Sequence, residues 1–143
     1  MRRRLERQDV IRTTVRRHRI RTQRDLVDHL RQAGHVCTQA TVSRDITEMG
    51  LRKLPEGVYV LAEDLHLQRM ISELVLSVVR SDRLVLVKAS PGTAPGVAAA
   101  LDAAGLDEVL GSIAGDDTVL IIAASEAGAE SLIASIDKYR GTF

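Results

Sequence analysis

The sequence predicts a mixed α/β (α+β) protein with an N-terminal winged helix-turn-helix and a C-terminal ββαββα antiparallel sheet whose helices cover one face. Helical periodicity dominates the first fifty residues, and four β-prone apolar runs follow in the second half. Residues 1–62 carry 14 Lys and Arg against 7 Asp and Glu, whereas residues 63–143 carry 6 against 12. We therefore expect two domains, at 1–62 and 69–143, joined by a polar linker at 63–68.

The composition narrows the possible functions. A net charge of +7 on residues 1–62, almost all of it from Arg, favours a polyanionic partner. The only aromatic residues are Tyr59, Tyr139 and Phe143, which argues against base stacking with single strands. A single cysteine, Cys37, permits no intramolecular disulfide. Because we find no signal peptide and no apolar run long enough to span a membrane, we expect a soluble, cytoplasmic protein.

Three helices are expected before residue 50. Residues 5–18 have one apolar face. In the second helix Thr22 and Asp25 resemble a capping pair, and Gly34 stands where a helix would stop. Thr38 is a plausible N-cap for the third helix. Two short helices joined by a tight link are typical of a helix-turn-helix.

The third helix separates its side chains by face. Val42, Ile46 and Met49 fall on one side. The opposite side carries Ala40, Ser43, Arg44 and Thr47. Small side chains allow close approach to a DNA groove, and Arg44 can contact guanine or a phosphate. The stripe therefore favours double-stranded DNA, although arginines that merely solvate a three-helix module remain an alternative.

A hairpin should follow this helix directly. In LRKLPEGVYVL, two β-prone runs flank the turn Pro55-Glu56-Gly57, as in a wing. Lys53 would lie near the base of the wing, within reach of a phosphate. The histidines show no metal-ligand spacing, so we expect no metal site.

The second half predicts strands at 73–79, 84–90, 108–114 and 118–124 and helices at 96–104 and 126–139. Leu67, Ile71, Leu74 and Val78 also fit a helix over 67–79, although β-branched content favours a hairpin from about Glu73. Both faces of the sheet are apolar, so we expect oligomerisation.

Asp116 and Asp117 interrupt the most apolar run of the chain, with no Lys or Arg within twenty residues on either side. Gly-Asp is ordinary turn chemistry between strands. The pair could instead be a site for a cation that the chain does not supply. Both interpretations remain open at this point.

Three motifs carry a resemblance that runs the whole length of the chain: TQATVSRDI at 38–46, SPG at 90–92 and LGSIAGDDT at 110–118. They resemble those of bacterial arginine repressors. The resemblance implies a non-enzymatic regulator with no cofactor, a homohexamer of two trimers. It implies that L-arginine binds between the trimers as co-repressor and that the hexamer holds palindromic operators of arginine-metabolism genes.

The resemblance also implies two sets of site residues. The DNA-binding residues would be Gln39, Thr41, Ser43 and Arg44, with Ser43 and Arg44 at the centre. The arginine-binding residues would be Asp102, Asp116 and Asp117. A guanidinium presents a planar fork of N–H donors that two carboxylates can meet, which would explain the adjacent aspartates.

One position departs from the family pattern. A Gln whose amide contacts the ligand commonly occurs where this chain has Pro95. Proline has no side-chain amide and no backbone N–H, so we expect weaker binding or another cationic amino acid as ligand.

Two other functions share features with this sequence. A feast/famine regulator also joins a DNA-binding head to an effector domain, but the wing and the GDDT hairpin argue against it. A magnesium-dependent nuclease would need further carboxylates converging near Asp116 and a catalytic Lys or His, which the sequence does not offer. DNA bending for recombination would be an added role.

Overall fold

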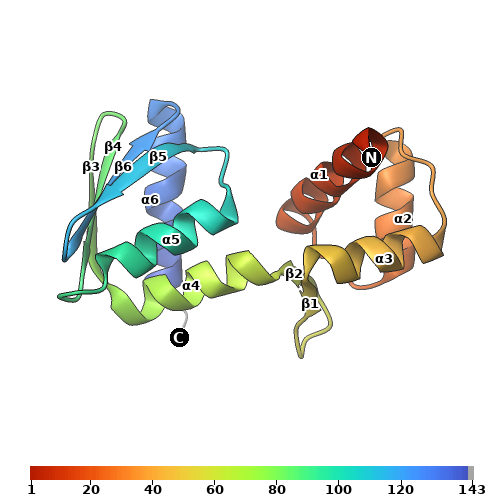
Figure 1. Cartoon of the computed structure of the whole chain (residues 1–143), viewed down its shortest axis with the longest axis horizontal. Coiled ribbons are helices and arrows are strands. Elements are labelled where there is room, and N and C mark those ends of the chain that lie inside the picture. The colour runs from red at the N-terminus through yellow and green to blue at the C-terminus, as the bar shows by residue number, and fades with distance from the viewer. Residues whose placement is uncertain (142–143) are drawn as a thin grey trace. The chain divides into compact units, whose positions relative to one another are not determined.

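The computed structural model describes residues 1–141. The chain forms two compact units, Met1–Ala62 and the remainder from Glu63 (Figure 1). Each unit has its own hydrophobic core. None of the helices in the described residues combines the length and apolar character needed to cross a bilayer.

The first unit is a winged helix-turn-helix, as predicted. It comprises α1 (Arg2–Arg17), α2 (Gln23–Gln32) and α3 (Gln39–Met49), followed by β1 (Leu51–Lys53) and β2 (Tyr59–Leu61). The two strands pair antiparallel as the wing. Side chains from all five elements build the core, because the apolar positions of each helix recur on one face.

The predicted caps of the first unit are confirmed. The Thr22 hydroxyl accepts a hydrogen bond from the Asp25 N–H, and the Thr38 hydroxyl accepts one from the Thr41 N–H. Gly50 ends α3 at φ +67°, a left-handed conformation that glycine adopts without strain. The chain therefore leaves α3 sharply and enters the wing at the next residue.

The second unit has the predicted ββαββα order, preceded by one more helix. Its elements are α4 (Ala62–Leu74), β3 (Val75–Ser81), β4 (Leu84–Ala89), α5 (Ala94–Ala104), β5 (Val109–Ala114), β6 (Thr118–Ala123) and α6 (Glu126–Arg140). The strands form one antiparallel sheet in the order β3-β4-β6-β5. The helices cover one face of this sheet (Figure 1).

The segment 63–68, which we expected to be a linker, is helical. It lies within α4, which begins at the residue after β2 ends. Leu67 and Ile71 stand one turn apart and are buried in the second core. The segment is mostly polar because only a narrow stripe of this amphipathic helix is buried. The alternative helical pattern was thus correct as far as Leu74, where the strand pattern takes over.

The other face of the sheet, here called the outer sheet face, is apolar and uncovered within the chain. The strand registers align Val79, Leu86, Leu120 and Ile113 across it. Its exposed large side chains are Leu76, Val79, Leu84, Leu110, Ile113 and Ile122. A row of this kind on a four-stranded sheet is typical of a surface that another protein chain covers.

Candidate DNA-binding and ligand-binding sites

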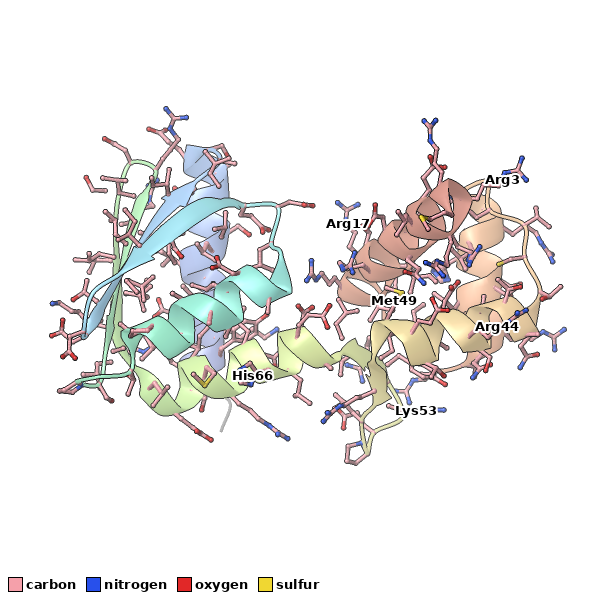
Figure 2. The ribbon with its side chains drawn as sticks, viewed as in Figure 1. Arg3, Arg17, Arg44, Met49, Lys53 and His66 are labelled. Carbon is pink, nitrogen blue, oxygen red and sulfur yellow. The ribbon has the colours of Figure 1, made fainter. Side chains whose placement is uncertain are left out.

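The predicted outward stripe of α3 lies on its solvent face. Of this stripe, Ala40, Arg44 and Thr47 are exposed and Ser43 is half-buried. Of the two weaker candidates for DNA contact on the same helix, Gln39 is exposed and Thr41 is half-buried. Arg44 is on the exposed side of α3 (Figure 2) and forms no ion pair with an acidic side chain among the described residues. The face therefore presents one unneutralised guanidinium among short side chains, which suits entry into a major groove.

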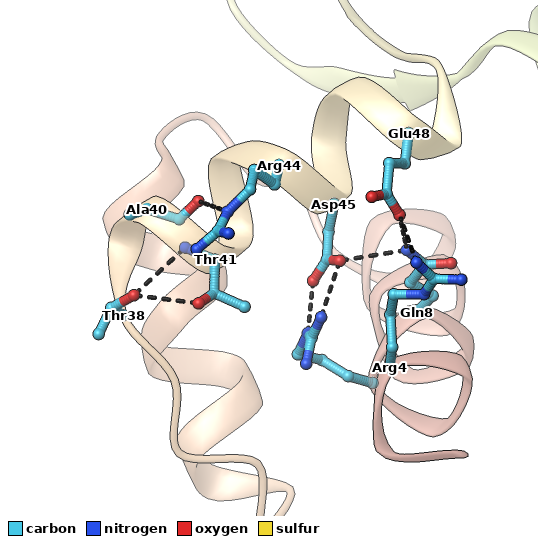
Figure 3. A network of polar contacts seen from close by, with 9 residues as sticks. Arg4, Gln8, Thr38, Ala40, Thr41, Arg44, Asp45 and Glu48 are labelled. Carbon is cyan, nitrogen blue, oxygen red and sulfur yellow. Dashed lines mark hydrogen bonds and ion pairs between the residues drawn. The ribbon is translucent and has the colours of Figure 1, made fainter. Parts of the chain in front are cut away.

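Local hydrogen bonds fix the start of this helix. The Thr41 hydroxyl lies 3.1 Å from the Thr38 hydroxyl, and the Arg44 Nε donates to the Ala40 carbonyl at 3.4 Å (Figure 3). Thr41 is thus engaged in the cap, whereas the terminal nitrogens of Arg44 remain available. Of the residues that the resemblance implies for DNA contact, Thr41 is the least free to move.

The inner side of α3 carries a polar cluster that we did not predict. Arg7 of α1 donates two hydrogen bonds to the two carboxylate oxygens of Asp45, the second at 2.9 Å. Gln8 donates a third to Asp45 at 3.1 Å and also reaches Glu48 at 3.0 Å. Arg4 lies 3.8 Å from Glu48. Figure 3 shows this cluster between α1 and α3.

Asp45 is ionised in this setting although it is buried. Burial raises the pKa of Asp45, but the hydrogen bonds from Arg7 and Gln8 outweigh it, so the pKa lies below the ordinary value of 3.8. The hydrogen bond to Asp45 also raises the pKa of Arg7. One sequence signal could have revealed the cluster, because Asp45 stands at an inward position, three residues after the core residue Val42.

The wing is held by two further basic residues. Arg21 Nη1 donates to the Glu56 carbonyl in the turn at 3.0 Å. Lys53 lies over the ring of Tyr59, with its ammonium 5.3 Å from the ring centroid, and stays exposed (Figure 2). Lys53 pairs with Tyr59 next to the turn, so it lies at the turn end of the wing and not near its base, where Leu51 pairs with Leu61. Arg21 is a wing contact that the sequence did not reveal.

The Asp116-Asp117 pair forms the exposed turn between β5 and β6, so the turn interpretation is correct as a description of the backbone. The SPG loop packs against this turn. The Asp117 carbonyl accepts from the Ala89 N–H at 2.7 Å, and the Asp116 carbonyl accepts from the Ala94 N–H at 3.2 Å. The two motifs are therefore one structural feature that presents two carboxylates to solvent.

One cation of the chain itself approaches the pair, although none is close to it in sequence. Lys88 and Thr118 are register partners on β4 and β6. Lys88 Nζ donates to the Thr118 hydroxyl at 2.8 Å and lies 4.0 Å from Asp117 Oδ1. The Thr118 hydroxyl donates to the same carboxylate. Lys88 and Asp117 are both half exposed, so this ion pair is weak, and Asp116 has no ion-pair partner among the described residues.

The structure does not bring Asp102 to this pair. Asp102 is exposed on α5, eight residues beyond Ala94, which corresponds to about 12 Å along the helix. Pro95 is the second residue of α5, where a missing N–H leaves no hydrogen bond unmade. Asp102 and the Asp pair thus cannot hold one guanidinium within a single chain. Among residues 1–141 no three His, Cys, Asp or Glu side chains gather as metal ligands would.

Comparison with known proteins gives two family matches. Residues 2–67 match the DNA-binding domain of arginine repressors, and residues 71–138 match their C-terminal domain. The arginine repressor of Carboxydothermus hydrogenoformans is 40% identical over 94% of this chain and 97% of its own length. That of Thermus thermophilus is 44% identical over 89% and 84%, and that of Koribacter versatilis is 41% identical over 90% and 92%.

Proposed function

This chain belongs to the arginine repressor family, and we propose that it is an arginine-responsive transcriptional repressor and not an enzyme. One observation carries the proposal: the DNA-binding family model covers the first unit and ends within α4, the C-terminal model lies wholly in the second unit, and each unit exposes a site of the matching charge. The basic unit holds operator DNA, and the acidic unit holds L-arginine. Both matches favour this family over a feast/famine regulator.

The DNA contact centres on α3. Arg44 reads a base edge or clamps a phosphate, and Ser43 and Gln39 lie beside it on the exposed face. Lys53 contacts a phosphate from the turn end of the wing. Thr41 contributes mainly by holding the helix start, since its hydroxyl is bonded to Thr38.

The ligand site is the turn between β5 and β6. Asp116 and Asp117 meet the guanidinium of L-arginine with charge-assisted hydrogen bonds, each of which contributes about 1.5–3 kcal/mol. Asp102 contacts a ligand that is bound between two subunits, because Asp102 lies too far from the Asp116-Asp117 pair of its own chain. Pro95 removes an amide contact, so binding is weaker than a Gln at this position would give.

The assembly is a homohexamer of two trimers in the cytoplasm. The outer sheet face supports oligomerisation, because six large apolar side chains are exposed on it in the single chain. Without ligand, apposed carboxylates repel one another. Arginine removes that repulsion and links the trimers, with a coupling to operator binding of about 1–3 kcal/mol.

The DNA assignment is tested by anisotropy with the duplex that the wild-type protein enriches from a randomised library. Arg44→Ala should weaken binding by about 1–3 kcal/mol. The matched control is Arg17→Ala, an exposed arginine at the end of α1, which should leave discrimination between sequences unchanged. Equal binding by Arg44→Ala and the wild type would overturn the assignment.

The ligand assignment is tested by thermal shift with L-arginine, L-citrulline, L-lysine and L-ornithine. A rise in melting temperature with L-arginine alone supports a guanidinium site. A ligand at a hundredfold excess over its Kd stabilises the folded state by about 2.7 kcal/mol, which a thermal shift detects. No rise with any of the four would leave only the DNA assignment standing.

The hexamer is tested by sedimentation of the wild type with and without L-arginine. Ile113→Asp, on the outer sheet face, should yield smaller species, whereas Leu5→Asp, an exposed apolar residue of the first unit, should not. A mass that is unaffected by either arginine or Ile113→Asp would contradict the proposed assembly.

A further inference from the structure

We propose that a polar clasp between α1 and α3 sets the orientation of the recognition helix, which makes Arg7 a positioning residue for operator discrimination. The clasp comprises Arg4, Arg7 and Gln8 of α1 with Asp45 and Glu48 of α3 (Figure 3). The inference rests on the proposed function, because it assigns a role in DNA recognition to residues that do not face DNA.

The Arg7–Asp45 pair fixes the relative orientation of the two planar side-chain groups as well as the distance between them. Arg7 Nε and Nη2 each donate to a different oxygen of Asp45, an arrangement in which both planar groups are aligned. Gln8 adds a third donor from the next residue of α1. Asp45 is the one charged residue that is buried among residues 1–141, so water does not compete for these bonds.

The apolar contacts of α3 cannot supply the same constraint. Val42 and Ile46 bury α3 against the core, but apolar contacts are non-directional and permit a helix to roll. A roll of about 20° displaces the surface of a helix about 10–12 Å wide by roughly 2 Å. A hydrogen bond to a base edge tolerates much less than that.

Asp45 is adjacent to Arg44 in sequence, so the two side chains leave the helix about 100° apart. The Arg44 side chain is exposed, whereas the Asp45 side chain is buried and paired with Arg7. Fixing the rotation of Asp45 therefore fixes the direction in which Arg44 projects. The clasp also neutralises the two carboxylates of α3, which would otherwise repel phosphates beside the recognition face.

The decisive variant is the double substitution Arg7→Met with Asp45→Leu. It keeps the net charge and replaces a buried ion pair with apolar side chains, an exchange that is often neutral or stabilising for folding. Thermal unfolding separates this effect from DNA recognition. Affinity is measured by anisotropy for the duplex enriched by the wild type and for a base-shuffled duplex of equal length.

We expect the double variant to unfold at or above the wild-type temperature while its preference for the enriched duplex falls at least tenfold. Its affinity for the shuffled duplex and the salt dependence of that affinity should be unchanged, because no phosphate-facing cation is lost. The matched control is Arg2→Met with Glu6→Leu, an exposed ion pair at 3.0 Å within α1, which should keep full discrimination.

Equal discrimination by the double variant and the wild type overturns the inference, because the pair would then serve stability alone. If the double variant does not fold, Arg7→Lys decides, since lysine keeps the charge but cannot bond both oxygens in the plane. Undiminished discrimination in a folded Arg7→Lys protein also overturns it. If the wild-type protein enriches no duplex, the proposed DNA-binding function itself is wrong. This outcome is distinct from failure of the inference about the clasp, in which the wild type enriches a duplex and the variants discriminate equally well.

Discussion

Asp45 and Asp117 each have a basic side chain nearby, yet they differ in burial and in how their oxygens are satisfied. The side chain of Asp45 is 2% exposed and accepts three hydrogen bonds. The side chain of Asp117 is 52% exposed, and its lysine stands 4.0 Å away. A carboxylate that the fold has fully satisfied holds structure, whereas one left half satisfied at the surface is available to a ligand.

The residues next to each aspartate in the sequence do not indicate which basic side chain it contacts. Asp45 directly follows Arg44, but its partner is Arg7, 38 residues away. Asp117 lies in a stretch without basic residues, but the sheet register places Lys88 beside it. Charge density along the chain is therefore a poor guide to charge pairing in space.

The largest expected effect comes from removing the cation at the buried site. Arg7→Met leaves the Asp45 carboxylate buried with only Gln8, which should destabilise the first unit by about 3–5 kcal/mol. Hydrogen exchange of the α3 amides measures the loss, and the α6 amides serve as an internal control in the other unit. Unchanged α3 exchange would show that Asp45 is not held by this pair.

Removing the carboxylate charge at the exposed site should affect ligand binding and not folding. Asp117→Asn should weaken L-arginine binding by about 1.5–3 kcal/mol, with ligand-free stability within about 0.5 kcal/mol of the wild type. Calorimetric titration measures the affinity, and Asp107→Asn provides an exposed control in the same unit. A loss of stability without a loss of affinity would show that Asp117 supports the fold and does not bind the ligand.

Strong acid should weaken the buried site. Because the pKa of folded Asp45 lies below 3.8, its stabilising contribution is present above that pH and is lost as the pH falls through the folded value. NMR methyl signals of Ile46 should therefore report unfolding of the first unit at acid pH. The Asp45→Asn protein should show a flatter pH dependence, and an identical profile would argue against a titrating role for Asp45.

The smallest effect is expected at Lys88. Lys88→Met removes an exposed ion pair, so ligand-free stability should change by less than about 1 kcal/mol. Arginine affinity should rise slightly, because the ligand no longer shares Asp117 with a lysine. A fall in affinity by calorimetry would instead indicate that Lys88 contacts the ligand.

The sequence by itself determined most of the elements and where the candidate site residues lie on them. The caps at Thr22 and Thr38, the outward stripe around Arg44 and the turn at Asp116-Asp117 were all predictable. These features depend on residues a few positions apart, because helix periodicity, capping and turn formation are local. The same local signals do not distinguish a polar linker at residues 63–68 from an amphipathic helix with a narrow buried stripe, and the structure has the helix.

Only the tertiary structure decided which distant groups meet. It joined Arg7 to Asp45, Lys88 to Asp117, and the Ala94 N–H to the Asp116 carbonyl. It also left Asp102 apart from the aspartate pair. Such pairings depend on how helices pack and on strand register, and a shift of one residue in register would turn Lys88 to the other face of the sheet.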